Sequence, residues 1–511
     1  YVDHNMAMFG PENHNDHLYL QSIARKVGVY HSRPGNGICH QVHLERFARP
    51  GATQLGSDSH TPTTGGIGSL SIGAGGLDVA VAMGGGPFYL TAPEVIGIRL
   101  LGKLPDWVAA KDVILQVLSI LTTSGNVGSV AEYFGPGVST LTVPQRATIT
   151  NMGAELGVTT SLFPSDEQTA AFLASQGRSE VFTPLAADPD ASYDRVIEID
   201  LSRLEPLAAA PSSPDNVKKV AELKDVKVQQ VQIGSCTNSS YRDLMMVASI
   251  LKGKTVHPDV ELGISPGSRQ VVQILSENGA LSDLISAGVR LLECGCGPCI
   301  GQGQSPGEGK VSVRTFNRNF KGRSGSKDDQ IYLVSPETAA AAALTGRLID
   351  PRRLPELFGL SYPPIPELQS MPINDNLIDK PLPPDQAAAA PVIRSSSIVT
   401  PPSAEKPPQK LDGTVLLRCG DKITTDHIMP AGSFLKYRSN VPEYARYVFH
   451  CFTESGKPSF AERALANQKA GRAGVIIAGE SYGQGSSREH AALCPMYLGV
   501  RLVIAKTMER I

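Results

Sequence analysis

The chain has 511 residues, of which 41% are apolar and 19% charged, and its formal net charge is −2. This composition is typical of a globular protein with several domains, and the near-neutral charge argues against nucleic acid or an acidic membrane as the main partner. No apolar run is long enough to predict a membrane span. The first residue is Tyr and the last residues fall within a strand-to-helix pattern, so we expect that both ends are cut. The sequence leaves open whether a targeting leader was removed.

The first two predicted domains are α/β. Residues 1–93 are rich in Gly, His and short apolar runs, and residues 94–205 follow with a predicted strand over 95–100 and a predicted amphipathic helix over 110–121. Strands that alternate with helices in this way predict layered domains whose strands are mostly parallel.

A third α/β domain is predicted over residues 206–361. Apolar strands over 226–233 and 289–292 lead into the segments GSCTNSS and CGCGPC. Later in this domain, Ser335 precedes Pro-Glu-Thr and a five-alanine run. This pattern predicts a helix that Ser335 caps and that ends at Gly346.

Residues 362–410 break the alternation of strands and helices. They are crowded with Pro and show little periodicity, which favours extended, semi-rigid conformations. We predict an interdomain linker that wraps over the surface. A last α/β domain, led by a strand, is predicted over residues 411–511.

Three of the eight cysteines, Cys294, Cys296 and Cys299, lie in the segment LLECGCGPCIGQ. A C-x-x-C turn places two thiolates on one side of a loop, as a zinc or iron–sulfur site requires. Cys236 follows an earlier predicted strand, and both strands are expected to end at the carboxyl edge of a parallel sheet, where such sheets bind ligands. Three thiolates can hold an iron–sulfur cubane and leave its fourth iron open. A dithiol redox motif and a structural zinc site remain alternatives.

Polar residues suited to chemistry gather in the first part of the chain. The segment 56–60, Gly-Ser-Asp-Ser-His, precedes a Gly-rich stretch. Exposed N–H groups there could bind an anion, although tight turns alone would also explain the glycines. Asp3 precedes His4, and a histidine oriented by an acid is a good general acid. His40 and Glu132 are further candidates, and each of these residues could instead be structural.

Two later segments are candidates for binding carboxylates. The segment TFNRNFKGRSG contains Asn317, Arg318 and Arg323, and arginines flanked by amides and Gly suit bidentate carboxylate binding. A solvated basic loop is the alternative. In YGQGSSREHAAL, Ser486 and Glu489 match a capping box, which predicts the start of a helix. A helix start with two serines and an arginine could also bind an anion.

The segments SDSHTPTTGGIG, GSCTNSSY, CGPCIG, NRNFKGR, TTDHIMPAG and YGQGSSREHAAL occur in this order, and with them the chain resembles the aconitase family, most closely its mitochondrial-type branch. The resemblance covers all of the chain except the Pro-rich linker. It implies three α/β domains around a [4Fe–4S] cluster and a linked, swivelling fourth α/β domain. The implied activity is that of a hydro-lyase of the tricarboxylic acid cycle, which interconverts citrate and isocitrate through cis-aconitate. It also implies a monomer, mitochondrial in a eukaryote and cytoplasmic in a bacterium, and we prefer the cytoplasm.

The resemblance further assigns roles to residues in the matching motifs. The cluster ligands would be Cys236, Cys296 and Cys299, with Cys294 a spare thiol. The catalytic set would be Asp3, His4, His40, Asp58, His60, Glu132, Asp426, His427 and Ser486, with His4 as the acid and Ser486 as the base. The substrate-binding set would be Asp58, Ser59, His60, Asn317, Arg318, Arg323, Arg438, Ser487 and Arg488.

The chain departs from the family pattern at three points. The family pattern leads us to expect a further N-terminal segment with a substrate-binding Gln before Tyr1 and a longer swivelling domain after Ile511. The stretch after Arg323 is short and resembles the isopropylmalate isomerase branch. The main alternative is therefore a related hydro-lyase acting on isopropylmalate, homoaconitate or methylcitrate, although Arg438 suits a third carboxylate. An RNA-binding protein on the same scaffold would need an extended basic surface. The third alternative is a fragment that is inactive as given.

Overall fold

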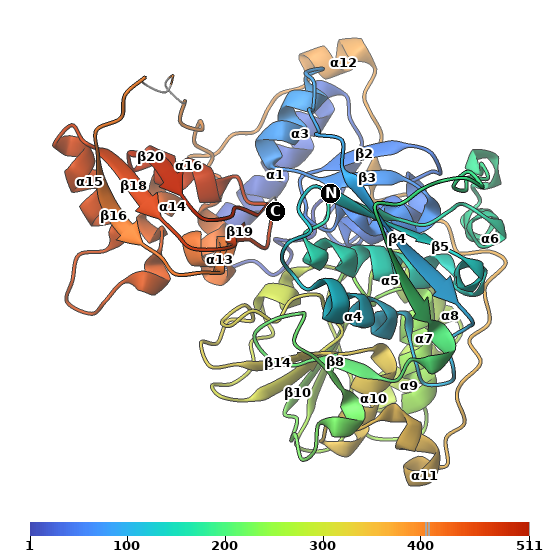
Figure 1. The fold of residues 1–511 in the computed structure, drawn as a ribbon. Helices are drawn as coiled ribbons and strands as arrows, with labels where there is room; N and C mark the ends of the chain where they lie inside the picture. Colours follow the sequence, from blue (N-terminus) through green and yellow to red (C-terminus); the bar gives the residue numbers. More distant parts are fainter. Residues whose placement is uncertain (404–405, 407–408, 510–511) are drawn as a thin grey trace.

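The computed structural model describes residues 1–403, 406 and 409–509. Residues 404–405 and 407–408 of the predicted linker, and residues 510–511 of the last predicted domain, lie outside the described residues. The fold is α/β, and its strands gather in successive units along the chain (Figure 1). Within the described part of the chain, no helix is long and apolar enough to cross a membrane.

The first unit contains one pair of parallel strands, and helices precede and follow this pair in the sequence. Its elements are β2 (Thr53–Gly56), β3 (Leu70–Gly73), α1 (Pro11–Val27), α2 (Cys39–Arg46), α3 (Gly76–Met83) and the 3-10 helix η1 (Thr61–Ile67). The Gly-rich stretch lies in η1, where it is buried. A Cβ atom on Gly65 would lie 1.9 Å from the carbonyl oxygen of Ser161, so close packing accounts for this glycine.

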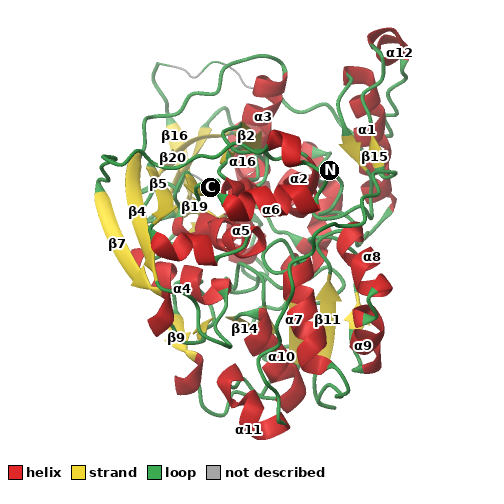
Figure 2. Cartoon of the chain, turned by 90° about the vertical axis from the view of Figure 1, so that its right-hand side faces the viewer, coloured by secondary structure: helices red, strands yellow, loops and turns green. Residues whose placement is uncertain are grey.

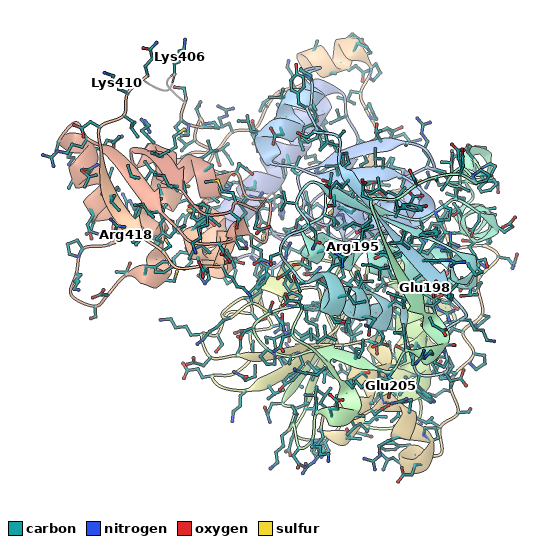
Figure 3. The ribbon with its side chains drawn as sticks, viewed as in Figure 1. Arg195, Glu198, Glu205, Lys406, Lys410 and Arg418 are labelled. Carbon is teal, nitrogen blue, oxygen red and sulfur yellow. The ribbon has the colours of Figure 1, made fainter. Side chains whose placement is uncertain are left out.

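The second unit is a four-stranded parallel sheet in the order β6-β5-β4-β7. Its elements are β4 (Glu94–Leu101), β5 (Ser129–Phe134), β6 (Thr160–Leu162), β7 (Arg195–Asp200), α4 (Ala110–Leu121), α5 (Val143–Gly153) and α6 (Glu167–Ser175). The strand predicted over 95–100 and the helix predicted over 110–121 are thus confirmed. Figure 2 shows β4 and β7 at the outer edge of the molecule and α4 and α5 farther in. The edge strand β7 presents charged side chains such as Arg195 and Glu198 to solvent (Figure 3), a common protection of sheet edges.

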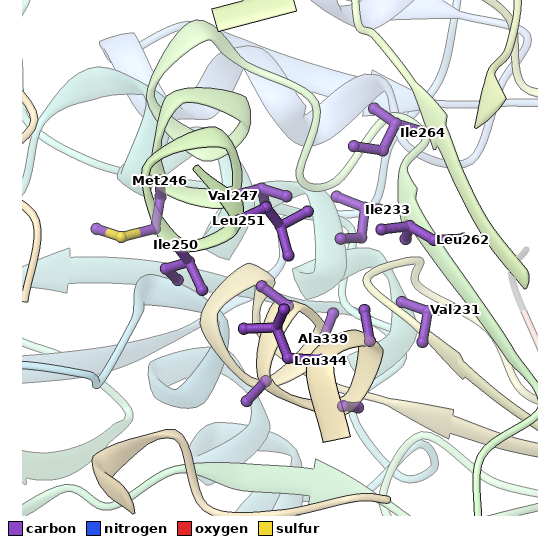
Figure 4. Close-up of a cluster of buried hydrophobic side chains, with 14 of the residues drawn as sticks. Val231, Ile233, Met246, Val247, Ile250, Leu251, Leu262, Ile264, Ala339 and Leu344 are labelled. Carbon is purple, nitrogen blue, oxygen red and sulfur yellow. The ribbon is translucent and has the colours of Figure 1, made fainter. Parts of the chain in front are cut away.

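The third unit is a seven-stranded sheet whose central strands are parallel. Its strands are β8 (Leu207–Ala209), β9 (Val217–Lys219), β10 (Gln230–Gly234), β11 (Glu261–Ser265), β12 (Arg290–Leu291), β13 (Val311–Arg314) and β14 (Gln330–Leu333). Its helices are α7 (Tyr241–Leu251), α8 (Arg269–Glu277), α9 (Ala280–Ser286), α10 (Pro336–Thr345) and α11 (Leu354–Phe358). Figure 4 shows apolar side chains of α7 and α10 packed on β10 and β11.

Helix α10 has the boundaries that the sequence predicts. Ser335 Oγ accepts a hydrogen bond from the Thr338 N–H at 3.3 Å, and the helix ends at Gly346 in the left-handed conformation. The strand predicted over 289–292 is shorter in the structure than in the prediction. It is β12, an exposed strand of two residues at the edge of the sheet.

The Pro-rich segment after the third unit lies partly along the first unit. Its short strand β15 (Ile378–Asp379) pairs with β1 (His31–Ser32), and its helix α12 (Pro384–Ala389) contacts α1. The last unit contains the parallel sheet β16-β18-β20 and the pair β17-β19. Its elements are β16 (Gly413–Arg418), β17 (Ile423–Thr424), β18 (Ala473–Ile477), β19 (Tyr482–Gln484), β20 (Val500–Ile504), α13 (Thr425–Ile428), α14 (Val441–Tyr444), α15 (Phe460–Lys469) and α16 (His490–Tyr497).

Candidate active site

A cavity of about 600 Å³ is lined by residues of the first, third and last units. The third unit contributes the residues that follow β10, β12 and β13, which is the carboxyl edge of its sheet. Ligands of open α/β sheets bind at this edge. Most of the residues that the sequence singles out line this one cavity although they are far apart in the chain.

Three thiols meet in the wall of the cavity. Cys236 follows β10, and Cys296 and Cys299 belong to the turn around the 3-10 helix η7 (Gly297–Ile300). The thiols of Cys236 and Cys299 each lie next to that of Cys296, whose own pKa is raised well above its usual value. This contact holds the pKa of Cys236 well below its usual value and lowers the pKa of Cys299 to about 5, although burial opposes both shifts. Thiolate is the form that binds metals.

The residues around the three sulfurs also suit an iron–sulfur cluster. Asn317 Nδ2 donates to Cys236 Sγ at 3.1 Å, and Arg323 Nη2 donates to Cys299 Sγ at 3.8 Å. Such donors to sulfur are the outer-shell partners that tune metal–thiolate sites. Cys294 is buried, which raises the pKa of its thiol to about 12, and it is not among the residues that line the cavity.

A chain of acids and histidines crosses the opposite wall. His4 Nδ1 lies 2.7 Å from Asp3 Oδ1, and His4 Nε2 lies 3.2 Å from Asp58 Oδ2. His40 Nε2 lies 2.9 Å from the other oxygen of Asp58. Burial lowers the pKa of His4, but the charges of Asp3 and Asp58 outweigh it and raise this pKa well above its usual value. His4 is therefore a protonated acid held in place at both nitrogens.

Glu155 joins this network through His60 and Arg318. Its Oε1 lies 3.0 Å from His60 Nε2 and 2.8 Å from Arg318 Nε. Arg318 Nη2 also donates to Ser59 Oγ at 2.9 Å. Despite burial, the negative charge of Cys236 and the contacts with Asp58 and Glu155 raise the pKa of His60 to about 9. The ligand atoms of His40, His60 and Cys236 lie within 4.8 Å of one another, so this wall faces the thiols directly.

The last unit closes the cavity through an ion-pair bridge. Asp426 Oδ2 accepts from Arg323 Nη1 at 2.9 Å, and Asp426 Oδ1 lies 2.8 Å from Arg488 Nη2. Burial disfavours the ionised Asp426, but the two guanidinium groups hold its pKa well below the usual range. Ser487 Oγ adds a hydrogen bond to the Ser57 carbonyl oxygen at 3.1 Å.

Comparison with known proteins decides the family. Residues 2–346 match the model of the Aconitase family (aconitate hydratase), and residues 439–511 match that of the Aconitase C-terminal domain. The chain belongs to the aconitase family. It is accordingly a hydro-lyase by family, as the motifs predict.

Similar proteins carry related names. The mitochondrial aconitate hydratase of Candida albicans is 37% identical, covering 96% of this chain and 70% of that protein. The mitochondrial homocitrate dehydratase of Saccharomyces cerevisiae is also 37% identical, covering 96% and 69%. The probable mitochondrial aconitate hydratase of Caenorhabditis elegans is 38% identical, covering 96% and 69%. Among solved structures, the holo-form of aconitase X from Thermococcus kodakaraensis has a TM-score of 0.35 and 14% identity, covering 55% of this chain and 66% of that one.

These aconitase relatives are mitochondrial, so they give no support to the cytoplasmic preference drawn from the sequence. The monomeric state stays a prediction.

Two residues that the resemblance placed in the catalytic set lie elsewhere. Glu132 lines a different pocket and accepts from the Tyr193 hydroxyl at 3.3 Å. The Nδ1 of His427 accepts from the Thr424 N–H at 3.0 Å, as part of the box that caps α13, so its ring serves the helix start. Neither is among the residues that line the cavity. Asp426 and Ser59 are not among them either, but they contact arginines that do, Asp426 through Arg323 and Arg488 and Ser59 through Arg318. The buried acid beside His60 is Glu155, which the sequence analysis missed.

The last unit also departs from the predicted local structure. The aconitase motif around Ser486 does not start a helix, because α16 begins at His490 and its N-cap Glu489 has no side-chain cap. Ser486 is half-buried and lines the cavity. Arg438 lines it as well, with an exposed side chain, and its carbonyl oxygen lies 2.7 Å from His490 Nε2.

Proposed function

We propose that this chain is an aconitate hydratase, which interconverts citrate and isocitrate by dehydration and rehydration through cis-aconitate. The observation that carries the proposal is the meeting of three thiols, a doubly held His4 and the arginines 318, 323 and 488 on one cavity. A polycarboxylate needs several cations, and its dehydration needs an acid and a base on the same substrate. The names of the curated relatives support the same activity.

We assign the three thiols to a [4Fe–4S] cluster. Cys236, Cys296 and Cys299 would hold it, and Asn317 and Arg323 would donate to the sulfurs. When bound, the cluster supplies a Lewis acid that helps the substrate hydroxyl depart.

His4 supplies the proton for the departing hydroxyl. Hydroxide is a poor leaving group from carbon, and protonation converts it to water. The charges of Asp3 and Asp58 keep the His4 ring protonated and fix its direction, since each carboxylate contacts one ring nitrogen. After the proton has left, the same two contacts favour its return from solvent.

Ser486 removes the proton from the substrate carbon in this proposal. Its neighbours on the chain fix its place, because the Gly485 carbonyl oxygen accepts from Arg318 Nη2 at 3.2 Å and Arg488 pairs with Asp426. The carbanion that forms places negative charge on the adjoining carboxylate. Arg318, Arg323 and Arg488 line the cavity and are the cations that we propose stabilise that charge. In this structure each is also paired with a carboxylate, Arg318 with Glu155 and the other two with Asp426.

A homocitrate dehydratase is the second candidate, since the yeast enzyme of that name is as similar as the first aconitate hydratase. Because the relatives are mitochondrial, we also propose the mitochondrial matrix as the location.

The test is a spectrophotometric assay of double-bond formation on the anaerobically reconstituted protein. Citrate, isocitrate, homocitrate and 3-isopropylmalate are compared at equal concentrations. Turnover of citrate and isocitrate is expected to exceed the others. Preference for homocitrate would support the second candidate, and turnover of 3-isopropylmalate alone would overturn both.

A further inference from the structure

A second pocket, separate from the catalytic cavity, lies at the carboxyl ends of β5 and β6. Its volume is about 430 Å³, which is within the range of small-molecule sites. Ala131 and Tyr133 of β5 point into the core formed with α4, so the alternating Glu132 and Phe134 lie on the opposite face of the sheet. The segment 185–193 forms the remaining wall.

The charge in this pocket is negative. Glu132 is half-buried, and Asp188 also lines the pocket, whereas its lining contains no Lys, Arg or His. In the described part of the chain, the Tyr193 hydroxyl is the hydrogen-bond partner of Glu132, at 3.3 Å, and no basic side chain forms an ion pair with it. Arg99, on the neighbouring strand, is paired with Glu198 at 3.1 Å instead. The Glu132 carboxylate therefore lacks a compensating cation, and burial raises its pKa.

Two aromatic rings form one side of the same pocket. The rings of Phe134 and Tyr193 stack with centroids 4.7 Å apart and an interplanar angle of 18°. Both lie against Gly97 of β4, where an added Cβ atom would lie 2.7 Å from Tyr193 Cγ and 3.0 Å from Phe134 Cε1. The missing side chain at position 97 thus leaves room for the two stacked rings beside Glu132.

We propose that this pocket binds a small organic ammonium ion, with its nitrogen against Glu132 and the aromatic pair and its apolar body among Leu162, Pro164 and Leu185. A carboxylate and ring faces are the groups that recognise alkylammonium ions. The catalytic cavity differs, because Arg318, Arg323, Arg438 and Arg488 line it. The proposal is independent of the proposed function, since none of its residues lines the catalytic cavity.

The test measures binding of benzyltrimethylammonium to the reconstituted protein by calorimetry and by saturation-transfer NMR, with benzyl alcohol as the neutral comparison. The cation is expected to bind at least tenfold more tightly than the alcohol. Glu132→Gln should weaken binding of the cation about tenfold and leave that of the alcohol unchanged, and Tyr193→Leu should weaken binding of the cation severalfold.

The matched control is Glu94→Gln, which removes an exposed acid at the start of β4 in the same sheet and is expected to keep the affinity for the cation. Thermal unfolding of each variant shows that it is folded, and Glu132→Gln adds no steric change. Saturating citrate should not displace the cation. Three results would overturn the proposal: equal affinity for cation and alcohol, unchanged affinity in Glu132→Gln, or displacement by citrate.

Discussion

Arg323, which follows β13 and lines the cavity, forms an ion pair with Asp426, in α13 of the last unit, with Nη1 donating to Oδ2 at 2.9 Å. Their sequence positions are 103 residues apart. Arg488 contacts the second oxygen of the same carboxylate at 2.8 Å. One half-buried acid therefore pairs with two cations and connects the last unit to the carboxyl edge of the third sheet.

Removing the charge of Asp426 is expected to loosen this closure. In Asp426→Asn the two guanidinium groups lose their shared anion, and a charge-assisted contact is worth about 1.5–3 kcal/mol. We expect KM for citrate to rise at least tenfold, together with a fall in kcat, measured by steady-state kinetics. The control Glu454→Gln changes an exposed acid of the same unit, which pairs with Lys457, and should leave both constants unchanged. Wild-type kinetics in Asp426→Asn would show that the pair does not serve closure.

Much of the fold could be predicted from local signals. Helix α10 begins and ends where Ser335 and Gly346 predict, and α4 matches its apolar periodicity. Such signals act within one or two turns of chain, so they are visible in a single sequence. The helix predicted at Ser486 fails because a capping-box pattern describes only a local possibility, and the loop is held instead by contacts of Gly485 and Arg488 across the cavity.

The candidate site could be predicted only where a motif contains the residue. The thiols and arginines follow from their segments, whereas Glu155 reaches His60 from 95 positions away. Its local surroundings, an acid just after α5, give no signal of this contact. Glu132 looked equally suitable in the sequence, but strand alternation turns it to the face of β5 that lies away from the core.

The assignment of Glu155, instead of Glu132, to the candidate site can be tested directly. Glu155→Gln removes the charge that orients His60 and Arg318, so kcat/KM for citrate should fall at least tenfold. Glu132→Gln, an identical chemical change outside the cavity, should retain kcat/KM. If Glu132→Gln lowered kcat/KM and Glu155→Gln retained it, the assignment of Glu155 to the site would be wrong.

Substitutions of Cys299 and Cys294 are also expected to differ in their effects on the cluster and on activity. Cys299→Ser is expected to abolish both the visible absorbance of the cluster and activity, because a cluster held by three thiols loses one ligand. Cys294→Ala should keep both, since Cys294 is a buried, protonated thiol that does not line the cavity. Iron content and absorbance after anaerobic reconstitution are the measurements. Full activity without iron in Cys299→Ser would contradict the cluster proposal.

Glu337, a buried acid in the first turn of α10, is expected to make the stability of the fold depend on pH. Burial raises the pKa of Glu337 to about 7, and its Oε2 has no hydrogen-bond partner within the described structure. Between its ordinary value near 4.3 and about 7, the unfolded chain has lost this proton while the folded chain retains it, so stability falls as pH rises through this window. Glu337→Gln should remove the loss of stability that comes from this carboxyl. The free energy of unfolding at pH 8 should therefore rise by roughly 1–3 kcal/mol.

Thermal unfolding at pH 5 and pH 8 measures this effect. The midpoint difference between the two pH values should shrink in Glu337→Gln and stay unchanged in Glu356→Gln, an exposed acid of α11. An unchanged difference in Glu337→Gln would mean that this carboxyl titrates alike in both states.

Ser486 provides the sharpest test of the proposed chemistry. Ser486→Ala removes the base but none of the cations at the cavity wall, so kcat should fall by about 10²–10⁴ while KM changes little. Ser487→Ala removes the hydrogen bond to Ser57 and should act mainly on KM, because it weakens closure and leaves the base in place. Single-turnover formation of cis-aconitate from citrate separates the chemical step from product release. A kcat for Ser486→Ala within threefold of wild type would show that another group removes the proton and that Ser486 only fills the loop.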